Sequence, residues 1–321
     1  MIYTVTLNPA LDRTLTVPSL RLGEVNRARS VRLDHSGKGI NVSRALRLLG
    51  VPSRIIAFLG GGTGRAIRDG LVAEGLDVFC AEVADETRQN VTVVDEGAGV
   101  LTKINEPGAA VSPADLAVMA ALIERSAAAG DLWAFTGSLP PGVPPDFYAR
   151  LITLVQARGG RAFLDSSGEA LRQGLTARPY AIKPNSEEAG EALGRPVVSD
   201  DDHVAALRWF QDNGSRLVCL TRGTRGIVLA LDGVPRTGAP RTGAPLSATP
   251  PPVVAASPIG AGDATLAGLV WAVRDGCDPA ETARRAVACG TAAAMQEGTG
   301  VGERASVEML LREVRVDRIP Q

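Results

Sequence analysis

Short apolar runs alternate along this chain with segments of helical periodicity. The runs are rich in Val, Ile and Phe and are bounded by Gly, Pro or Asp, which is typical of buried strands. The strands predicted in this way cover residues 2–7, 54–59, 91–94, 132–135, 162–164, 180–182, 217–220 and 227–231. Apolar residues recur at i, i+3, i+4 and i+7 from Val42, Leu116 and Leu266, and these spacings predict amphipathic helices.

The alternation of strand and helix predicts an α/β fold with a mainly parallel central sheet covered by helices. Two segments, at about 12–31 and 83–106, interrupt this rhythm. The second alternates apolar and polar residues like a hairpin from Val91 to Ile104. Extra antiparallel strands of this kind indicate a lid or a dimer contact.

Composition excludes several classes of protein. The 321 residues include 34 Lys+Arg and 35 Asp+Glu, so neither a disordered chain nor a polycation for nucleic acid is expected. The four cysteines form no CxxC pair and two histidines cannot build a multi-His metal site. The N-terminus resembles a strand and not a signal peptide, and no apolar run reaches the roughly 18 residues of a membrane span. We therefore expect a cytoplasmic protein with no membrane partner.

The strongest chemical signal is Pro258-Ile-Gly-Ala-Gly-Asp263, which opens a predicted helix. A glycine turn at a helix start exposes backbone N–H groups, and the helix dipole adds partial positive charge, so the turn suits a phosphate group. Asp263 falls in the first helical turn. The alternative, an aspartate that only stabilises this turn, is equally compatible with the residues.

A second glycine-containing turn, Ser36-Gly-Lys-Gly-Ile-Asn41, also leads into a predicted helix. It is not a P-loop, because Gly39 stands where Ser or Thr is required. Gly37 and Gly39 allow close approach of the backbone to a ligand, and Asn41 could hold sugar hydroxyls. A simple turn with a helix cap remains the alternative.

Three further motifs follow predicted strands. Lys183-Pro-Asn-Ser-Glu-Glu188 places Asn185 and Glu188 on one helix face, where their oxygens suit Mg²⁺ through water; a capped helix is the alternative. Thr221-Arg-Gly-Thr-Arg-Gly226 suits a nucleotide-side loop or a plain hairpin turn. Thr136-Gly-Ser-Leu-Pro-Pro-Gly142 is not a nucleophile elbow.

Three other features are interpreted as structural. His203 is predicted to be solvated at a polar helix start, and His35 borders the glycine turn at 37–39. The tandem repeat Pro-Arg-Thr-Gly-Ala at 235–244 is interpreted as a surface insertion.

Taken in order and spacing, these motifs resemble the ribokinase/PfkB family of sugar kinases from Thr6 to about Thr299. The matching segments are Asn8-Pro-Ala-Leu-Asp12, Gly37-Lys-Gly-Ile-Asn-Val, Thr87-Arg-Gln-Asn90, Gly137-Ser-Leu-Pro-Pro-Gly, Asp165-Ser-Ser-Gly, Lys183-Pro-Asn and Gly260-Ala-Gly-Asp. They are similar to the phosphosugar branch of the family. Gly23-Glu-Val-Asn26 and Lys38 look more like 1-phosphofructokinases and tagatose-6-phosphate kinases, whereas Thr87-Arg-Gln-Asn90 looks like the minor 6-phosphofructokinase.

The resemblance implies a single three-layer α/β/α domain over residues 1–321, with lid strands at about 12–35 and 83–106. It further implies ATP and Mg²⁺ as cofactors and a homodimer formed through the lids. The substrate would be a ketohexose monophosphate, with fructose 1-phosphate favoured and tagatose 6-phosphate or fructose 6-phosphate as alternatives.

The same resemblance implies a role for each matched residue. Asp263 would be the general base, and Gly260, Ala261 and Gly262 would present N–H groups to the transferred phosphoryl group. The substrate-binding residues would be Asp12, Gly39 and Asn41 for the sugar, and Arg88, Ser138 and Lys38 for its phosphate. The nucleotide would lie along Lys183, Asn185, Thr221, Gly223 and Gly226, and Asn185 and Glu188 would organise Mg²⁺ through water.

Other functions remain open. A non-catalytic sugar-phosphate sensor would keep the fold without the chemistry, although the intact Asp263 and Gly260-Ala-Gly262 argue against it. A nucleoside or vitamin kinase is disfavoured by the Arg88 motif. A dinucleotide-binding oxidoreductase lacks its glycine fingerprint after the first strand.

Overall fold

A computed structural model describes residues 1–231, 244–296 and 300–319. In this part of the chain ten strands form one sheet, parallel from β5 to β11 and antiparallel beyond. In spatial order they are β14 (Arg315–Arg318), β13 (Leu246–Thr249), β12 (Ile227–Leu231), β11 (Leu217–Thr221), β10 (Ala181–Ile182), β9 (Arg161–Asp165), β8 (Leu132–Thr136), β1 (Ile2–Thr6), β4 (Arg54–Gly60) and β5 (Asp77–Val83). The predicted fold class, α/β with a mainly parallel sheet, is confirmed.

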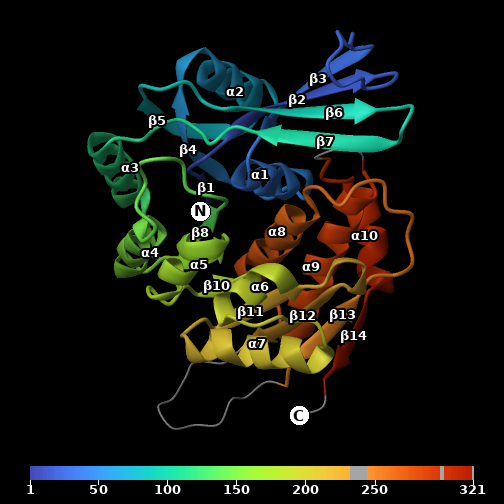
Figure 1. The fold of residues 1–321 in the computed structure, drawn as a ribbon. Helices are drawn as coiled ribbons and strands as arrows, with labels where there is room; N and C mark the ends of the chain where they lie inside the picture. The colour runs from blue at the N-terminus through green and yellow to red at the C-terminus, as the bar shows by residue number, and fades with distance from the viewer. Residues whose placement is uncertain (232–243, 297–299, 320–321) are drawn as a thin grey trace.

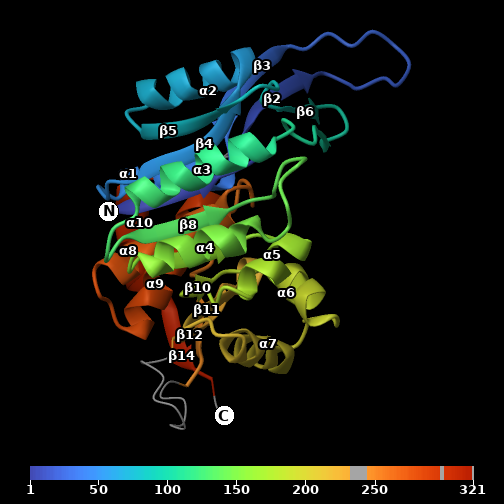
Figure 2. The same ribbon diagram turned by 90° about the vertical axis from the view of Figure 1, so that its left-hand side faces the viewer.

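Helices cover both faces of this sheet and complete three layers (Figures 1 and 2). One face packs against α1 (Lys38–Leu48), α2 (Gly61–Ala73), α8 (Ala261–Arg274), α9 (Pro279–Ala294) and α10 (Arg304–Glu313). The other packs against α3 (Pro113–Ser126), α4 (Phe147–Ala157), α5 (Gly168–Leu175), α6 (Ser186–Leu193) and α7 (Asp200–Asp212).

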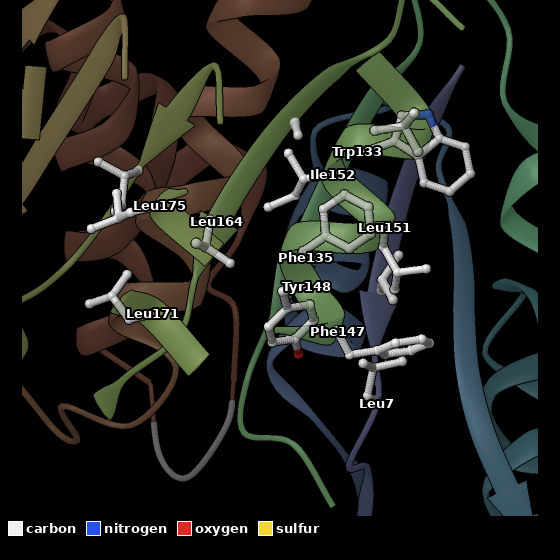
Figure 3. Close-up of a cluster of buried hydrophobic side chains, with 14 of the residues drawn as sticks. Leu7, Trp133, Phe135, Phe147, Tyr148, Leu151, Ile152, Leu164, Leu171 and Leu175 are labelled. Carbon is white, nitrogen blue, oxygen red and sulfur yellow. The ribbon is translucent and has the colours of Figure 1, made fainter. Parts of the chain in front are cut away.

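Strand β8 shows how the sequence builds this arrangement. All five of its residues are buried, and successive side chains enter opposite layers, as the period of two requires. Trp133 and Phe135 pack toward α4, whereas Leu132 and Ala134 pack toward the layer of α8 and α9. Figure 3 shows the two aromatic rings among the side chains of α4. A strand of this kind appears in the sequence as a continuous apolar run.

All of the predicted strands are present, but β5, β13 and β14 were not predicted. These three lie toward the ends of the sheet order, where one face or one edge is exposed. Strand β14 has the sequence Arg-Val-Asp-Arg and is mostly exposed, so it carries no apolar run. Edge strands are commonly short and charged, which removes the pattern that identifies interior strands.

A separate sheet of four strands forms the lid, at the top of Figure 1. Its order is β3 (Ser30–Ser36), β2 (Ala10–Val17), β6 (Gln89–Asp95) and β7 (Val100–Asn105). Strands β6 and β7 pair antiparallel as the predicted hairpin, and β2 pairs in parallel with β6. The two lid segments follow β1 and β5 in the chain.

Two other expectations have different outcomes. The prediction that His203 is solvated is wrong: its ring is fully buried, and its Nδ1 lies 2.6 Å from the carbonyl oxygen of Ser199. The helix start around it is polar, but this residue faces the core because it lies on the apolar side of α7. The repeat at 235–244 lies outside the described residues except for Ala244. No described helix is long and apolar enough to cross a membrane.

Candidate active site

The chain changes direction across the sheet between β1 and β8, and this switch point is where ligands bind in open parallel sheets. The parallel strands end at one edge, so the residues that follow them come together. These residues are Asn8 after β1, Gly137 and Ser138 after β8, Asp165 at the end of β9, Lys183 after β10 and Thr221 at the end of β11. Five separate motifs of the sequence therefore meet along one edge.

Helix α8 brings Asp263 to this edge. Its N-cap Gly260 has φ of 81°, a left-handed conformation that a glycine adopts without strain, and the helix begins at Ala261. Asp263 lies in the first turn and is only 8% exposed. Its Oδ2 accepts a hydrogen bond of 2.9 Å from Nδ2 of Asn41, in the first turn of α1. The two glycine turns of the sequence therefore form one site.

The environment of Asp263 favours proton uptake near neutral pH. Burial, with the nearby negative charge of Asp165, raises the pKa of Asp263 to about 6. The hydrogen bond from Asn41 and the charges of Lys38 and Lys183 oppose this shift. A carboxyl group with a pKa in this range is ionised at pH 7 and is still basic enough to accept a proton from a hydroxyl group.

Asp165 lies between two lysines at the centre of the site. Its Oδ1 is 3.2 Å from Nζ of Lys38, and its Oδ2 is 3.2 Å from Nζ of Lys183. Burial alone would raise the pKa of Asp165, but the two lysines hold it below its usual value. In turn, Asp165 raises the pKa of Lys38. Asp165 therefore stays ionised, and it holds the side chains of both lysines beside Asp263.

Arg88 lies on the other side of the switch point, where it joins the lid to the main sheet. Its guanidinium donates to three backbone carbonyl oxygens, those of Asn8 (2.8 Å), Glu106 (3.1 Å) and Pro9 (3.3 Å). One N–H on each terminal nitrogen is left over, since arginine has five. The side chain of Asn8 donates to Ser138 Oγ at 3.3 Å. Arg88 and Ser138, both predicted to bind the substrate phosphate, thus flank Asn8.

The lid contributes Asp12. Its Oδ1 accepts a hydrogen bond of 2.8 Å from Asn90 Nδ2 on the neighbouring strand β6. The register pairs Asp12 with Asn90 on one side and with Asp34 on the other, so these three side chains share one face of the lid. No described residue donates a hydrogen bond to the second oxygen of Asp12, so this oxygen is available to a polyhydroxylated ligand.

The segment at 221–226 forms a short turn between β11 and β12, with a 3₁₀ turn at Gly223–Arg225. An isolated parallel bridge joins Asn185 to Thr221, so the two predicted nucleotide motifs lie side by side. The Arg222 guanidinium is buried under this turn and donates to Ser247 Oγ at 2.8 Å. The turn is therefore fixed from below. Gly223 is exposed, whereas Gly226 is buried against Ala248.

The donors near α6 fit a hydrated Mg²⁺ better than a directly bound one. Asn185 and Glu188 form a capping box, which uses Asn185 Oδ1 and Glu188 Oε2. Glu188 Oε1 remains and lies 3.8 Å from Nζ of Lys38. No cluster of three or more metal-ligating side chains occurs in the described residues. Mg²⁺ commonly keeps several waters and binds through few carboxylates together with substrate phosphates, which suits this arrangement.

Most of the predicted site residues therefore lie along one edge, although in two groups: Asp263, Asn41, Lys38 and Lys183 on one side, and Arg88 and Ser138 on the other. Asp165 belongs to one of the matched motifs, but no role was predicted for it from the sequence. An aspartate directly after a fully buried strand was the signal that could have identified it.

The geometry defines a class of protein. A basic carboxylate at a helix N-terminus, two lysines that pair with a buried aspartate, and glycine turns at the edge of an α/β sheet make a phosphotransferase site. The model of the pfkB family of carbohydrate kinases matches residues 5–305, and the chain belongs to this family. It is a phosphotransferase with an alcohol group as acceptor and ATP as donor.

Both the curated relatives and the solved structures match nearly the full length of this chain. It is 37% identical to the 1-phosphofructokinase of Rhodobacter capsulatus over 320 residues, 99% of this chain and 98% of the relative. It is 31% identical over 300 residues to the ATP-dependent 6-phosphofructokinase isozyme 2 of Escherichia coli, 93% and 94% of the two chains. A crystal structure of Escherichia coli phosphofructokinase-2 with potassium superposes with a TM-score of 0.89 at 29% identity, covering 97% and 98%.

Proposed function

We propose that this protein transfers the terminal phosphoryl group of ATP to a ketohexose monophosphate, and that its main substrate is fructose 1-phosphate, which becomes fructose 1,6-bisphosphate. The observation that carries the proposal is a buried, basic Asp263 at a helix N-terminus, beside two lysines that Asp165 holds in place. The similarity to a 1-phosphofructokinase at 37% identity favours this substrate. Fructose 6-phosphate and tagatose 6-phosphate are the alternatives.

In this proposal Asp263 Oδ1 accepts the proton of the attacking hydroxyl group while a new bond forms between that oxygen and phosphorus. The bond between phosphorus and the bridging oxygen breaks, and ADP leaves with the electron pair. The N–H groups of Gly260, Ala261 and Gly262 stabilise the charge on the transferred group. Asp12, Gly39 and Asn41 orient the sugar, and Arg88 and Ser138 bind its existing phosphate.

The nucleotide is proposed to lie along Lys183, Thr221, Gly223 and Gly226, next to Asn185. A side chain added at Gly262 would come within 3.5 Å of Lys183 Nζ, so the backbone N–H groups of α8 and this ammonium face a common space. Mg²⁺ would be held through water by Asn185 and Glu188, where it would neutralise phosphate charge. The position of Lys38 between Asp165 and Glu188 suits the transferred phosphoryl group as well as the sugar phosphate.

We further propose that the protein is a cytoplasmic homodimer formed through the lids. The register divides each lid into two faces, and Asp12 and Asn90 lie on the polar one. The opposite face carries exposed apolar side chains, Val31 (51% exposed), Leu33 (54%) and Ile104 (60%), next to Arg13. Burial of such a face against its copy would stabilise a dimer.

The test is ADP release by the purified protein with ATP and Mg²⁺ and, in turn, fructose 1-phosphate, fructose 6-phosphate, tagatose 6-phosphate and free fructose. The proposal expects one phosphosugar, fructose 1-phosphate, to have the highest kcat/KM. Turnover of free fructose alone, or binding of phosphosugars without turnover, would contradict it; the latter result would favour a sensor.

A further inference from the structure

A second hydrogen bond to Asn41 comes from an arginine that the sequence motifs did not include. Arg44 lies one helical turn after Asn41 on α1, and its Nη1 donates to Asn41 Oδ1 at 3.3 Å. Its Nε and Nη2 donate hydrogen bonds to Oε2 (2.7 Å) and Oε1 (2.8 Å) of Glu74, the C-cap residue of α2. The side chain of Arg44 is 17% exposed. A partly buried bidentate pair thus holds Arg44 against Asn41.

The two bonds to Asn41 fix which way its amide points. The amide oxygen accepts from Arg44, and the amide nitrogen donates to Asp263 Oδ2. If the amide were rotated by 180°, its oxygen would face the carboxylate of Asp263, and both are acceptors. Its nitrogen would face the guanidinium of Arg44, and both are donors. In the observed orientation Oδ2 of Asp263 is occupied, and no group of the described chain hydrogen-bonds to Oδ1, the oxygen assigned to the substrate proton.

We propose that Arg44, held by Glu74, is a positioning residue that fixes the amide orientation of Asn41 and through it the carboxylate of the catalytic base. The inference rests on the proposed function of Asp263 as that base. It adds α2, on the far side of α1 from Asp263, to the machinery of phosphoryl transfer.

Several charged groups act on this chain of contacts. Asp165, Lys38 and Lys183 face Asp263. Glu74 faces Arg44 from α2, and His35 from lid strand β3 approaches Glu74, with 3.3 Å between Nδ1 and Oε1. A test must therefore separate loss of orientation from a change in the local charge.

The test compares Arg44→Met with Arg47→Met, which removes the same charge from an exposed position one turn further along α1. The pKa of Asp263 is read by ¹³C NMR on enzyme labelled at the aspartate carboxyl carbons, with its signal assigned by Asp263→Asn. Loss of orientation weakens the donor to the ionised carboxylate, so Arg44→Met should raise this pKa by about 0.5 or more. Below this pKa, where only part of Asp263 is ionised, kcat/KM of Arg44→Met for the phosphosugar should be about threefold lower than that of the wild type. At pH 8.5 the two values should be similar.

Glu74→Gln separates the two causes by sign, and it also serves if Arg44→Met fails to fold. Removal of a negative charge would by its field alone lower the pKa of Asp263, whereas release of Arg44 would raise it. An upward shift in both variants, with Arg47→Met unchanged, supports the inference. Equal shifts in Arg44→Met and Arg47→Met, or a downward shift in Glu74→Gln, would overturn it. The NMR readout needs no turnover, so it is independent of whether the proposed substrate is right.

Discussion

Two buried aspartates of the site have opposite titration behaviour. Asp263 and Asp165 are 8% and 1% exposed, yet the pKa of Asp263 is raised and that of Asp165 is lowered. The difference lies in their partners: Asp165 contacts two lysines, whereas Asp263 contacts a neutral amide. One carboxylate therefore stays charged and orders the lysines, and the other is able to exchange a proton near neutral pH.

The raised pKa of Asp263 predicts that Asp263→Asn is more stable than the wild type at high pH. The ordinary pKa of 3.8 rises to about 6 on folding, so the folded state binds more protons between these values. Stability from this group is thus present below pH 4 and is lost as the pH rises through 6. In thermal or urea unfolding at pH 8, the free energy of unfolding of Asp263→Asn should exceed that of the wild type by about 2–3 kcal/mol.

This gain should disappear near pH 4. Asp69→Asn, at an exposed position on α2, is the control and should show no such pH dependence. A difference between Asp263→Asn and the wild type that stays constant from pH 4 to 8 would contradict the prediction.

At the scale of elements, the site depends on turns whose glycines leave no room for a side chain. Gly226 has φ of 76°, and a Cβ there would collide with the carbonyl oxygen of Ala248 on β13. Gly226 ends the turn that begins at Thr221, and Thr221 forms a β-bridge with Asn185. Strand pairing and the proposed nucleotide contact therefore depend on one residue.

Gly226→Ala should lower stability by about 2 kcal/mol or more and raise KM for ATP several-fold, because both the backbone strain and the collision oppose the native turn. Gly194→Ala is the matched control: Gly194 also has positive φ, 69°, but its Cβ would meet open space. Urea unfolding and steady-state kinetics measure the two effects. Equal losses of stability and equal changes in KM in the two variants would contradict the prediction, because they would show that the collision at Gly226 has no effect.

Local patterns predicted the interior strands and the two glycine turns because burial on both faces and helix starts leave signals within a few residues. Contacts between distant segments leave none. Lys38 with Asp165 and Arg44 with Glu74 join residues 127 and 30 positions apart, so only the fold reveals them. For His203 the local pattern was misleading: its polar neighbours predicted a solvated side chain, but the ring packs into the core.

At the scale of the molecule, the lid is a two-sided sheet whose polar face carries Asp12 while its apolar face is exposed. Val31 and Leu15 pair across β2 and β3 on the apolar face, and Val91 and Ile104 pair across β6 and β7. A lid dimer would cover this face and fix the lid over the carboxyl edge. Assembly and catalysis would then be coupled.

If the protein forms the proposed lid dimer, Val31→Asp should make it monomeric, because each copy would bring a charge into the interface. Val118→Asp on α3 is the control, since Val118 is equally exposed at 51% but lies outside the lid. Analytical ultracentrifugation over a concentration series measures the change. A wild type that is monomeric at micromolar concentration, or a dimer unaffected by Val31→Asp, would contradict a lid interface.

The central claim, that Asp263 is the general base, is tested most directly by the pH dependence of phosphosugar kcat/KM for the wild type and Asp263→Asn. The wild type should lose activity below an apparent pKa near 6, the value set by burial and Asp165. Asp263→Asn should be about 10²-fold or more slower and lack this acid limb. An Asp263→Asn enzyme that keeps both the rate and the acid limb of the wild type would show that another group takes the proton.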